Sequence, residues 1–153
     1  MDLKQFFILA LLTATCAVHF MGCSQPTLQE KAEKGDAIAQ YQLGVKFHNG
    51  DGVPQGIETA VSWYHKSAEL GYAAAQVNLG YMYFSGKVVE KDLAEAAKWF
   101  EKAAEQGDAM GQSNLGAMYA EGQGVSQDLV TARMWLSLAA AAGEMAGGEN
   151  RDK

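Results

Sequence analysis

Cysteine is almost absent from this chain of 153 residues, and both copies, Cys16 and Cys23, lie within the first 23 positions. The remaining sequence can therefore form no internal disulfide, even in an oxidising compartment. Basic residues are also few, because 12 Lys and Arg stand against 18 Asp and Glu and leave a net charge of -6. Phosphate backbones select basic surfaces, so this balance argues against a nucleic-acid partner.

Patterns of catalysis and metal binding are missing as well. After the first 23 residues the only histidines are His48 and His65, and no set of His and carboxylates recurs at zinc-ligand spacing. The loop GDGVPQG at residues 50–56 has the glycines of a phosphate loop but lacks its Lys-Ser or Lys-Thr pair. No nucleophile can be matched with a base and an orienting group. We therefore expect no enzyme, no cofactor and no metal.

The sequence of residues 1–22 indicates a signal peptide. Their apolar segment, FFILALLTATCAV, is shorter than the about 20 residues that a permanent membrane helix needs. The following FMGC resembles the lipobox of bacterial lipoproteins, in which the cysteine becomes the acylated N-terminus. We expect lipidation at Cys23 and a periplasm-facing outer-membrane lipoprotein that meets the membrane through this anchor alone. The alternative is an ordinary cleaved signal peptide and a periplasmic or secreted protein.

The rest of the chain is organised by a period of 36 residues. Glycines in this part of the chain lie 36 residues apart among apolar residues, as Gly35, Gly71, Gly107 and Gly143 show. A constant period without insertions predicts stacked units of one supersecondary type. The units are repeat 1 at residues 35–70, repeat 2 at 71–106 and repeat 3 at 107–142. We expect residues 23–34 to form a tether and a short capping helix, and 143–153 a C-terminal tail.

Each unit is expected to form two helices, because apolar residues recur at steps of three and four in both of its halves. Glycine at the start of the connecting loop, as at Gly50, suits the left-handed residue that ends a helix. Asp92 and Asp128 stand at N-cap positions, and Glu95 completes a pair like a capping box with Asp92. The predicted helices lie near residues 37–49, 57–70, 73–85, 93–106, 109–121 and 129–142, with no strand.

The recurring residues inside the helices predict close packing. Glycine within a helix costs on the order of 1 kcal/mol relative to alanine, so its recurrence needs a compensating contact. We expect small residues to admit the ring of the Trp63 and Tyr64 pair and its equivalents, and Gln40 to bond with neighbouring backbone. The structural positions are Gly44, Gly80 and Gly116, together with Trp63, Trp99 and Trp135.

The repeated unit resembles the Sel-one-like repeat (SLR), a relative of the tetratricopeptide repeat. WYHKSAELG at residues 63–71 and WFEKAAEQG at 99–107 carry the resemblance, with an A-x-A-Q-x-x-L-G half before them. It implies an all-α, right-handed solenoid of antiparallel helix pairs that acts as a protein-binding scaffold or adaptor and catalyses no reaction. Some secreted cysteine-rich relatives are linked to penicillin binding or β-lactam hydrolysis. Those relatives have a disulfide in each repeat, which this chain lacks.

The resemblance also indicates where a partner would bind. In tetratricopeptide-type solenoids the first helix of each pair lines the concave face, so its non-recurring positions are free to encode a partner. Amides there can pair with an extended peptide, and aromatic rings can anchor it. Alternatively, Tyr81 and Phe84 pack between units. The predicted binding residues are Tyr41, Gln42, Val45, His48, Asn49, Asn78, Tyr81, Phe84, Asn114 and Glu121.

The expected function is therefore a protein-binding or peptide-binding scaffold in the bacterial cell envelope. A secreted effector that engages host proteins would use the same fold at a different address. The repeat pattern fails after Gly143, because Gly147 and Gly148 replace its Ala and Gln. Solenoids normally finish with a polar helix, so the last helix, with Trp135 and Leu136, lacks this cover. We expect that end to self-associate or to bind a partner.

Overall fold

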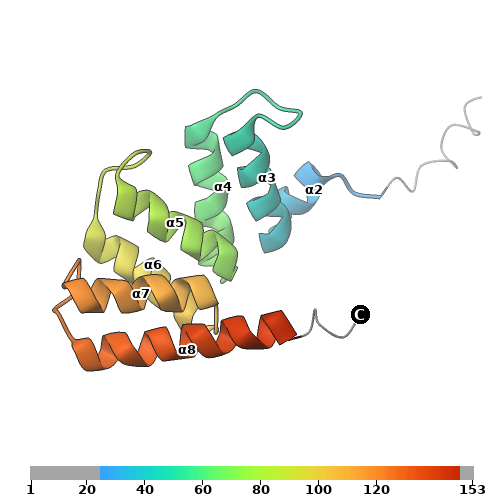
Figure 1. Cartoon of the computed structure of the whole chain (residues 1–153). Helices are drawn as coiled ribbons and strands as arrows, with labels where there is room; N and C mark the ends of the chain where they lie inside the picture. The colour runs from blue at the N-terminus through green and yellow to red at the C-terminus, as the bar shows by residue number, and fades with distance from the viewer. Residues whose placement is uncertain (1–24, 149–153) are drawn as a thin grey trace, which may run out of the picture.

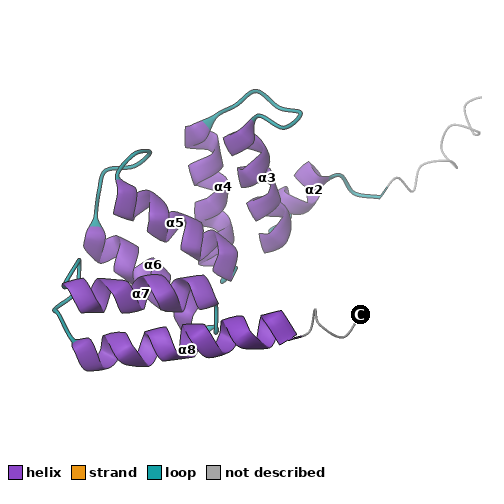
Figure 2. Cartoon of the chain, viewed as in Figure 1, coloured by secondary structure: helices purple, strands orange, loops and turns teal. Residues whose placement is uncertain are grey.

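The computed structural model describes residues 25–148, with side chains described as far as residue 143. Within that range the chain is helical and contains no strand (Figure 2). The all-α prediction is confirmed, and five of the six predicted repeat helices agree within a residue. The helices are α2 (Leu28–Glu33), α3 (Ala37–Asn49), α4 (Ile57–Glu69), α5 (Ala73–Ser85), α6 (Leu93–Glu105), α7 (Ala109–Glu121) and α8 (Leu129–Gly148).

The helices form three pairs, α3 with α4, α5 with α6 and α7 with α8, and each pair packs on the next. Figure 1 shows the pairs turning from nearly upright at α3 and α4 to horizontal at α7 and α8. The first helices α5 and α7 also contact each other, so first helices lie along one side of the stack. The chain is thus a short solenoid of helix pairs.

One side-chain bond links each first helix to the helix before it. The Gln40 side chain donates to the Ala32 carbonyl oxygen over 3.0 Å, and Gln76 and Gln112 repeat this bond to Ala68 and Ala104. The predicted bond from Gln40 to backbone is confirmed. Since α2 carries Ala32 and packs on α3, it takes the place of a preceding unit's second helix. The helix α2 therefore packs on the N-terminal side of the first pair.

Glycine and aspartate set the helix ends. Gly50, with φ of +80°, closes α3 in the left-handed conformation, as predicted. The Asp92 carboxylate accepts from the Glu95 amide over 2.9 Å, but the Glu95 carboxylate pairs with Lys98 instead of completing a capping box. The box predicted there forms only on its Asp92 side. A reciprocal box does occur at the start of α2, between Thr27 and Glu30.

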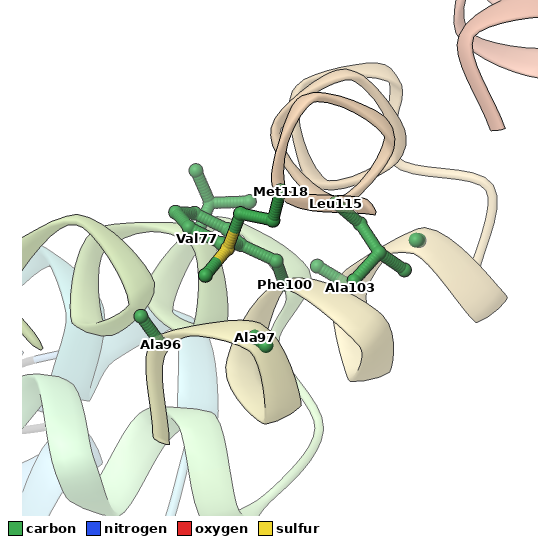
Figure 3. Packing of buried hydrophobic residues seen from close by; sticks show 8 residues of the cluster. Val77, Ala96, Ala97, Phe100, Ala103, Leu115 and Met118 are labelled. Carbon is green, nitrogen blue, oxygen red and sulfur yellow. The ribbon is translucent and has the colours of Figure 1, made fainter. Parts of the chain in front are cut away.

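Two of the three recurring helical glycines, Gly44 and Gly80, pack directly on aromatic rings, whereas Gly116 packs on the Leu136 side chain. A Cβ atom built on Gly80 would lie 2.5 Å from the Phe100 ring, and one on Gly44 would lie 2.7 Å from the Tyr64 ring. Close approach is confirmed, and the ring is that of Tyr64, since Trp63 instead lies half-buried under Lys66. Figure 3 shows the largest core cluster, where α5, α6 and α7 meet. Its buried members are Val77, Ala96, Ala97, Phe100, Ala103, Ala104, Leu115 and Met118.

The last helix differs from its prediction, because α8 continues to Gly148 instead of ending near residue 142. Gly107, at the same position in the preceding unit, ends its helix at φ of +86°, whereas Gly143 lies within α8. Asp108 after Gly107 caps the next helix, but Glu144 follows Gly143 and is a weak N-cap residue. Residues 139–142 are all alanine, which favours continued helix.

Candidate binding surface

The ten predicted binding residues lie on the first helices α3, α5 and α7, and we call the solvent side of these helices the inner face. They occupy five register positions that recur every 36 residues. The structure divides them into three groups. Tyr41, Val45 and Asn78 lie between repeats 1 and 2, whereas Phe84, Asn114 and Glu121 line a pocket with Tyr81 beside it. Gln42, His48 and Asn49 belong to neither place.

In repeat 1 the aromatic and aliphatic positions are used for packing. The Tyr41 ring lies 5.7 Å from the Tyr64 ring and 5.1 Å from the Tyr72 ring, between centroids. Val45 packs against the buried cluster that contains Tyr64. Burial raises the pKa of Tyr64 to about 12, the nearby Tyr41 adds to this, and a hydrogen bond with Asn78 opposes it. Tyr41, Val45 and Asn78 therefore hold repeat 1 against repeat 2.

The other repeat 1 positions do not converge on one site. Gln42 and Asn49 are exposed, and the Asn49 amide donates to the Asp51 carboxylate over 3.2 Å. His48 is half-buried, and its backbone oxygen accepts from Gln55 over 2.8 Å. These contacts are local, so they carry no argument for a ligand.

Between repeats 2 and 3 the polar and aromatic positions meet. The Asn114 amide donates to the Tyr81 hydroxyl over 2.9 Å and to the Met110 carbonyl over 2.7 Å. The Tyr81 ring packs edge-on against Phe100 at 5.3 Å between centroids, yet 45% of Tyr81 remains exposed. Tyr81 is thus held in one orientation while it still faces solvent.

Beside this pair lies a small pocket of about 80 Å³. Its walls come from all three neighbouring helices, and Figure 3 shows Phe100 of α6 and Met118 of α7 close to Val77 of α5. The Glu121 carboxylate lies at the rim and accepts from the Gln123 amide over 2.6 Å. The lining residues are Phe84, Phe100, Asn114, Ala117, Met118, Glu121 and Gln123.

The sequence of repeat 3 explains why the pocket is open. Three register positions of the first helix hold small residues in repeat 3, namely Ser113, Ala117 and Ala120. The same positions hold larger residues in repeat 1 (Tyr41, Val45 and His48) and in repeat 2 (Val77, Tyr81 and Phe84). Of the three small residues Ala117 lines the pocket, and its small side chain leaves space there that a larger residue would fill. The pocket therefore combines an apolar floor with an amide and a carboxylate, a composition suited to an anchoring side chain of a peptide.

Three predicted residues, Phe84, Asn114 and Glu121, thus line one pocket, and Tyr81 contacts Asn114. The ten predicted residues omit Phe100, Ala117, Met118 and Gln123, which also line it. Register could have indicated Phe100, because it stands 36 residues after Tyr64. Met118 recurs from Met82 as a core position, so its access to the pocket follows only from the small neighbours in α7.

Other predictions fall partly outside this surface. Cys23 and residues 1–22 lie outside the described residues, as do residues 149–153 of the predicted C-terminal tail. Across the described helices, none combines the length and apolar character that crossing a membrane would require. Over residues 25–148 no His, Cys, Asp and Glu side chains gather as metal ligands.

The Sel1 repeat family model matches residues 37–72, 73–108 and 109–144. The chain is also similar to the crystal structure of c5321, a protective antigen of uropathogenic Escherichia coli, with 49% identity and a TM-score of 0.72. That match covers 76% of this chain but 25% of the antigen, so the chain spans a quarter of that protein's length.

Two further solved structures match. A Sel1 repeat protein from Oxalobacter formigenes is 39% identical with a TM-score of 0.74, covering 82% of this chain and 96% of that one. Cysteine-rich protein B of Helicobacter pylori has 24% identity and a TM-score of 0.60, covering 76% and 92%, and shows the shared fold alone. Among proteins with curated descriptions, none matches. This chain belongs to the Sel1 repeat family.

Proposed function

We propose that this Sel1 repeat protein is a non-enzymatic binding module whose protein or peptide partner docks on the inner face. Sel1 repeats typically form protein-interaction scaffolds, which gives the general class. The observation that supports the location is the pocket between α5, α6 and α7, where Phe84, Asn114 and Glu121 of the predicted positions meet. An apolar side chain of the partner enters it, and Asn114 and Glu121 meet polar groups beside that side chain.

Filling the pocket tests this proposal. Ala117 is exposed and lines the pocket, so Ala117→Leu narrows it without disturbing a buried position. The full chain, its Ala117→Leu variant and a matched Ala94→Leu variant would be used to capture proteins from cell-envelope extracts, followed by mass spectrometry. Ala94 is an exposed position on α6 away from the pocket. Proteins lost with Ala117→Leu but kept with Ala94→Leu support the proposal, and equal capture by all three contradicts it.

We further propose that the protein is exported and anchored through a lipid on Cys23, with the repeats facing the periplasm. The FMGC motif supports this proposal. Cys23→Ser should move the protein from the membrane fraction to the soluble fraction or leave its precursor uncleaved. A wild-type protein that incorporates no labelled fatty acid contradicts the anchor. Recovery from the culture medium would favour a secreted effector.

A further inference from the structure

The outer side of α8 departs from the pattern of its own repeat. We call its exposed positions Val130, Met134, Leu138 and Ala141 the outer stripe. In α4 the same register positions hold Glu58, Ser62, Lys66 and Glu69, and in α6 they hold Ala94, Lys98, Lys102 and Glu105. All these positions are exposed, so burial within the chain does not explain the apolar residues in α8.

The fold itself accepts a lysine at one of these positions. Lys66 lies over the Trp63 ring at 4.3 Å, and Lys102 lies over the Trp99 ring at 4.0 Å. Such contacts between a cation and an aromatic face are favourable, yet repeat 3 has Leu138 at this position beside Trp135. Val130 is 82% exposed, Met134 48% and Leu138 45%. A row of exposed apolar residues at helical spacing indicates a docking surface.

Exposure elsewhere on α8 has a simpler cause. Leu136 is 42% exposed and stands at the register of the buried Tyr64 and Phe100. Those two residues are covered by the first helix of the following unit, and within the described range no such helix follows α8. Leu136 therefore says nothing about a partner, whereas the outer stripe lies on the side that is solvent-exposed in every repeat.

We propose that the outer stripe binds the same stripe of a second copy, with the two α8 helices antiparallel about a two-fold axis near Leu138. Two-fold self-association brings identical patches together, so each stripe must complement itself. With the axis at this position, Met134 of one copy lies opposite Ala141 of the other. A large side chain then meets a small one on both sides of the axis, and Leu138 meets its own counterpart.

Charge along α8 fits the same arrangement. Arg133 and Glu144 occupy positions 11 residues apart (144 − 133), which is about three helical turns, so both positions lie on one flank of the stripe. In an antiparallel pair like flanks face each other, and position 133 then meets position 144 of the other copy. In a parallel pair this flank of one copy would instead face the other flank of the second copy, which contains Thr131. Opposite charges at facing positions favour the antiparallel arrangement.

The same charges argue against a lipid surface as the occupant. Interfacial helices carry several Lys and Arg on their polar sides, whereas α8 has a single basic residue, Arg133, and one acidic residue, Glu144. One helix face is also small beside the roughly 800 Å² per partner of a standard interface. We therefore expect a weak dimer whose population depends on the protein concentration.

Sedimentation velocity of the full chain across a range of concentrations tests the dimer. Met134→Lys with Leu138→Lys introduces the residues that α6 has at these positions, Lys98 and Lys102, so folding is retained, as circular dichroism would check. This variant should dimerise at least about 10-fold more weakly. A matched variant, Ser62→Lys with Ala94→Lys, adds the same charge to the outer sides of α4 and α6 and should dimerise like the wild type. A monomeric wild type, or equal dimerisation by all three proteins, overturns the proposal.

Cysteine cross-linking tests the orientation, in a full chain with Cys16→Ser and Cys23→Ser. Leu138→Cys should form a disulfide-linked dimer on oxidation, because it lies at the axis. Met134→Cys should link to Ala141→Cys in a mixture, and Val130→Cys should not link to itself. Self-linking by Val130→Cys without the mixed product would show parallel pairing and contradict the proposal. A monomer that instead sediments with phosphatidylglycerol vesicles would identify a lipid surface and overturn it too.

Discussion

Single residues of this chain carry two kinds of information, one repeated and one not. Gly44 and Gln40 recur because each unit needs the same close side-chain contact and the same backbone bond, so the sequence alone could predict both. Ala117 does not recur, and its effect depends on the larger Val45 and Tyr81 that stand at the same position in the other units. The pocket could therefore not be predicted from a list of aromatic and amide positions, because it arises where side chains are small.

At Gly80 the ring contact makes a strong prediction. A Cβ atom there would come within 2.5 Å of Phe100, which is 1% exposed and has little room to move. Gly80→Leu should lower the free energy of unfolding by roughly 2 kcal/mol or more through overpacking. Ala117→Leu, at an exposed position of α7, is the control and should change it by less than about 0.5 kcal/mol. Urea denaturation measures both, and an unchanged midpoint for Gly80→Leu would contradict close helix approach.

Tyr64 makes the stability depend on pH in the alkaline range. Burial raises its pKa from 10.0 to about 12, so the folded protein favours the neutral phenol more than the unfolded chain does. The resulting stability is complete below about pH 10 and falls as the pH rises toward 12. Tyr64→Phe, which copies Phe100 at this register, should lose less stability over the same interval. Thermal melts of both proteins between pH 9 and pH 12 compare them, and identical pH profiles would refute the assignment.

At the level of helices, the 36-residue period is enough to predict the bounds of most of the helices. Five predicted helices agree within a residue, because glycine, aspartate and apolar spacing recur together at their ends. The sixth prediction is wrong at its C-terminal end, since a repeated glycine does not by itself form a turn. Gly107 ends α6 where Asp108 caps the following helix, whereas Gly143 has no such cap after it. Context therefore decides whether the same residue ends a helix.

The two glycines should respond in opposite ways to the same substitution. Gly143→Ala places a better helix former inside α8, where no neighbouring atom lies within 4 Å, and should stabilise the fold by about 0.5–1 kcal/mol. Gly107→Ala forces alanine into φ of +86° and should destabilise it by about 1 kcal/mol or more. Chemical denaturation of both variants checks the signs. A destabilising Gly143→Ala would show that α8 ends at the glycine.

On the scale of the whole molecule, the solenoid separates three surfaces. The N-terminal side is covered by α2, the inner face of repeats 2 and 3 holds the pocket, and the outer stripe of α8 lies on the opposite side of its helix pair from α7. A partner on the inner face and a second copy on α8 could therefore bind together. The fold and its family follow from the repeat, whereas the identity of the partner depends on the few positions that do not repeat.

Hydrogen–deuterium exchange of the full chain, alone and with a captured partner, tests the binding site most directly. The account predicts slower exchange in peptides from residues 77–86 and 109–123, which carry the pocket and Tyr81, and unchanged exchange in α4. The Ala117→Leu variant, mixed with the same partner, should show no such slowing. Slower exchange confined to α8, or to α3 and α4, with the pocket peptides unchanged, would contradict a binding site on the inner face of repeats 2 and 3.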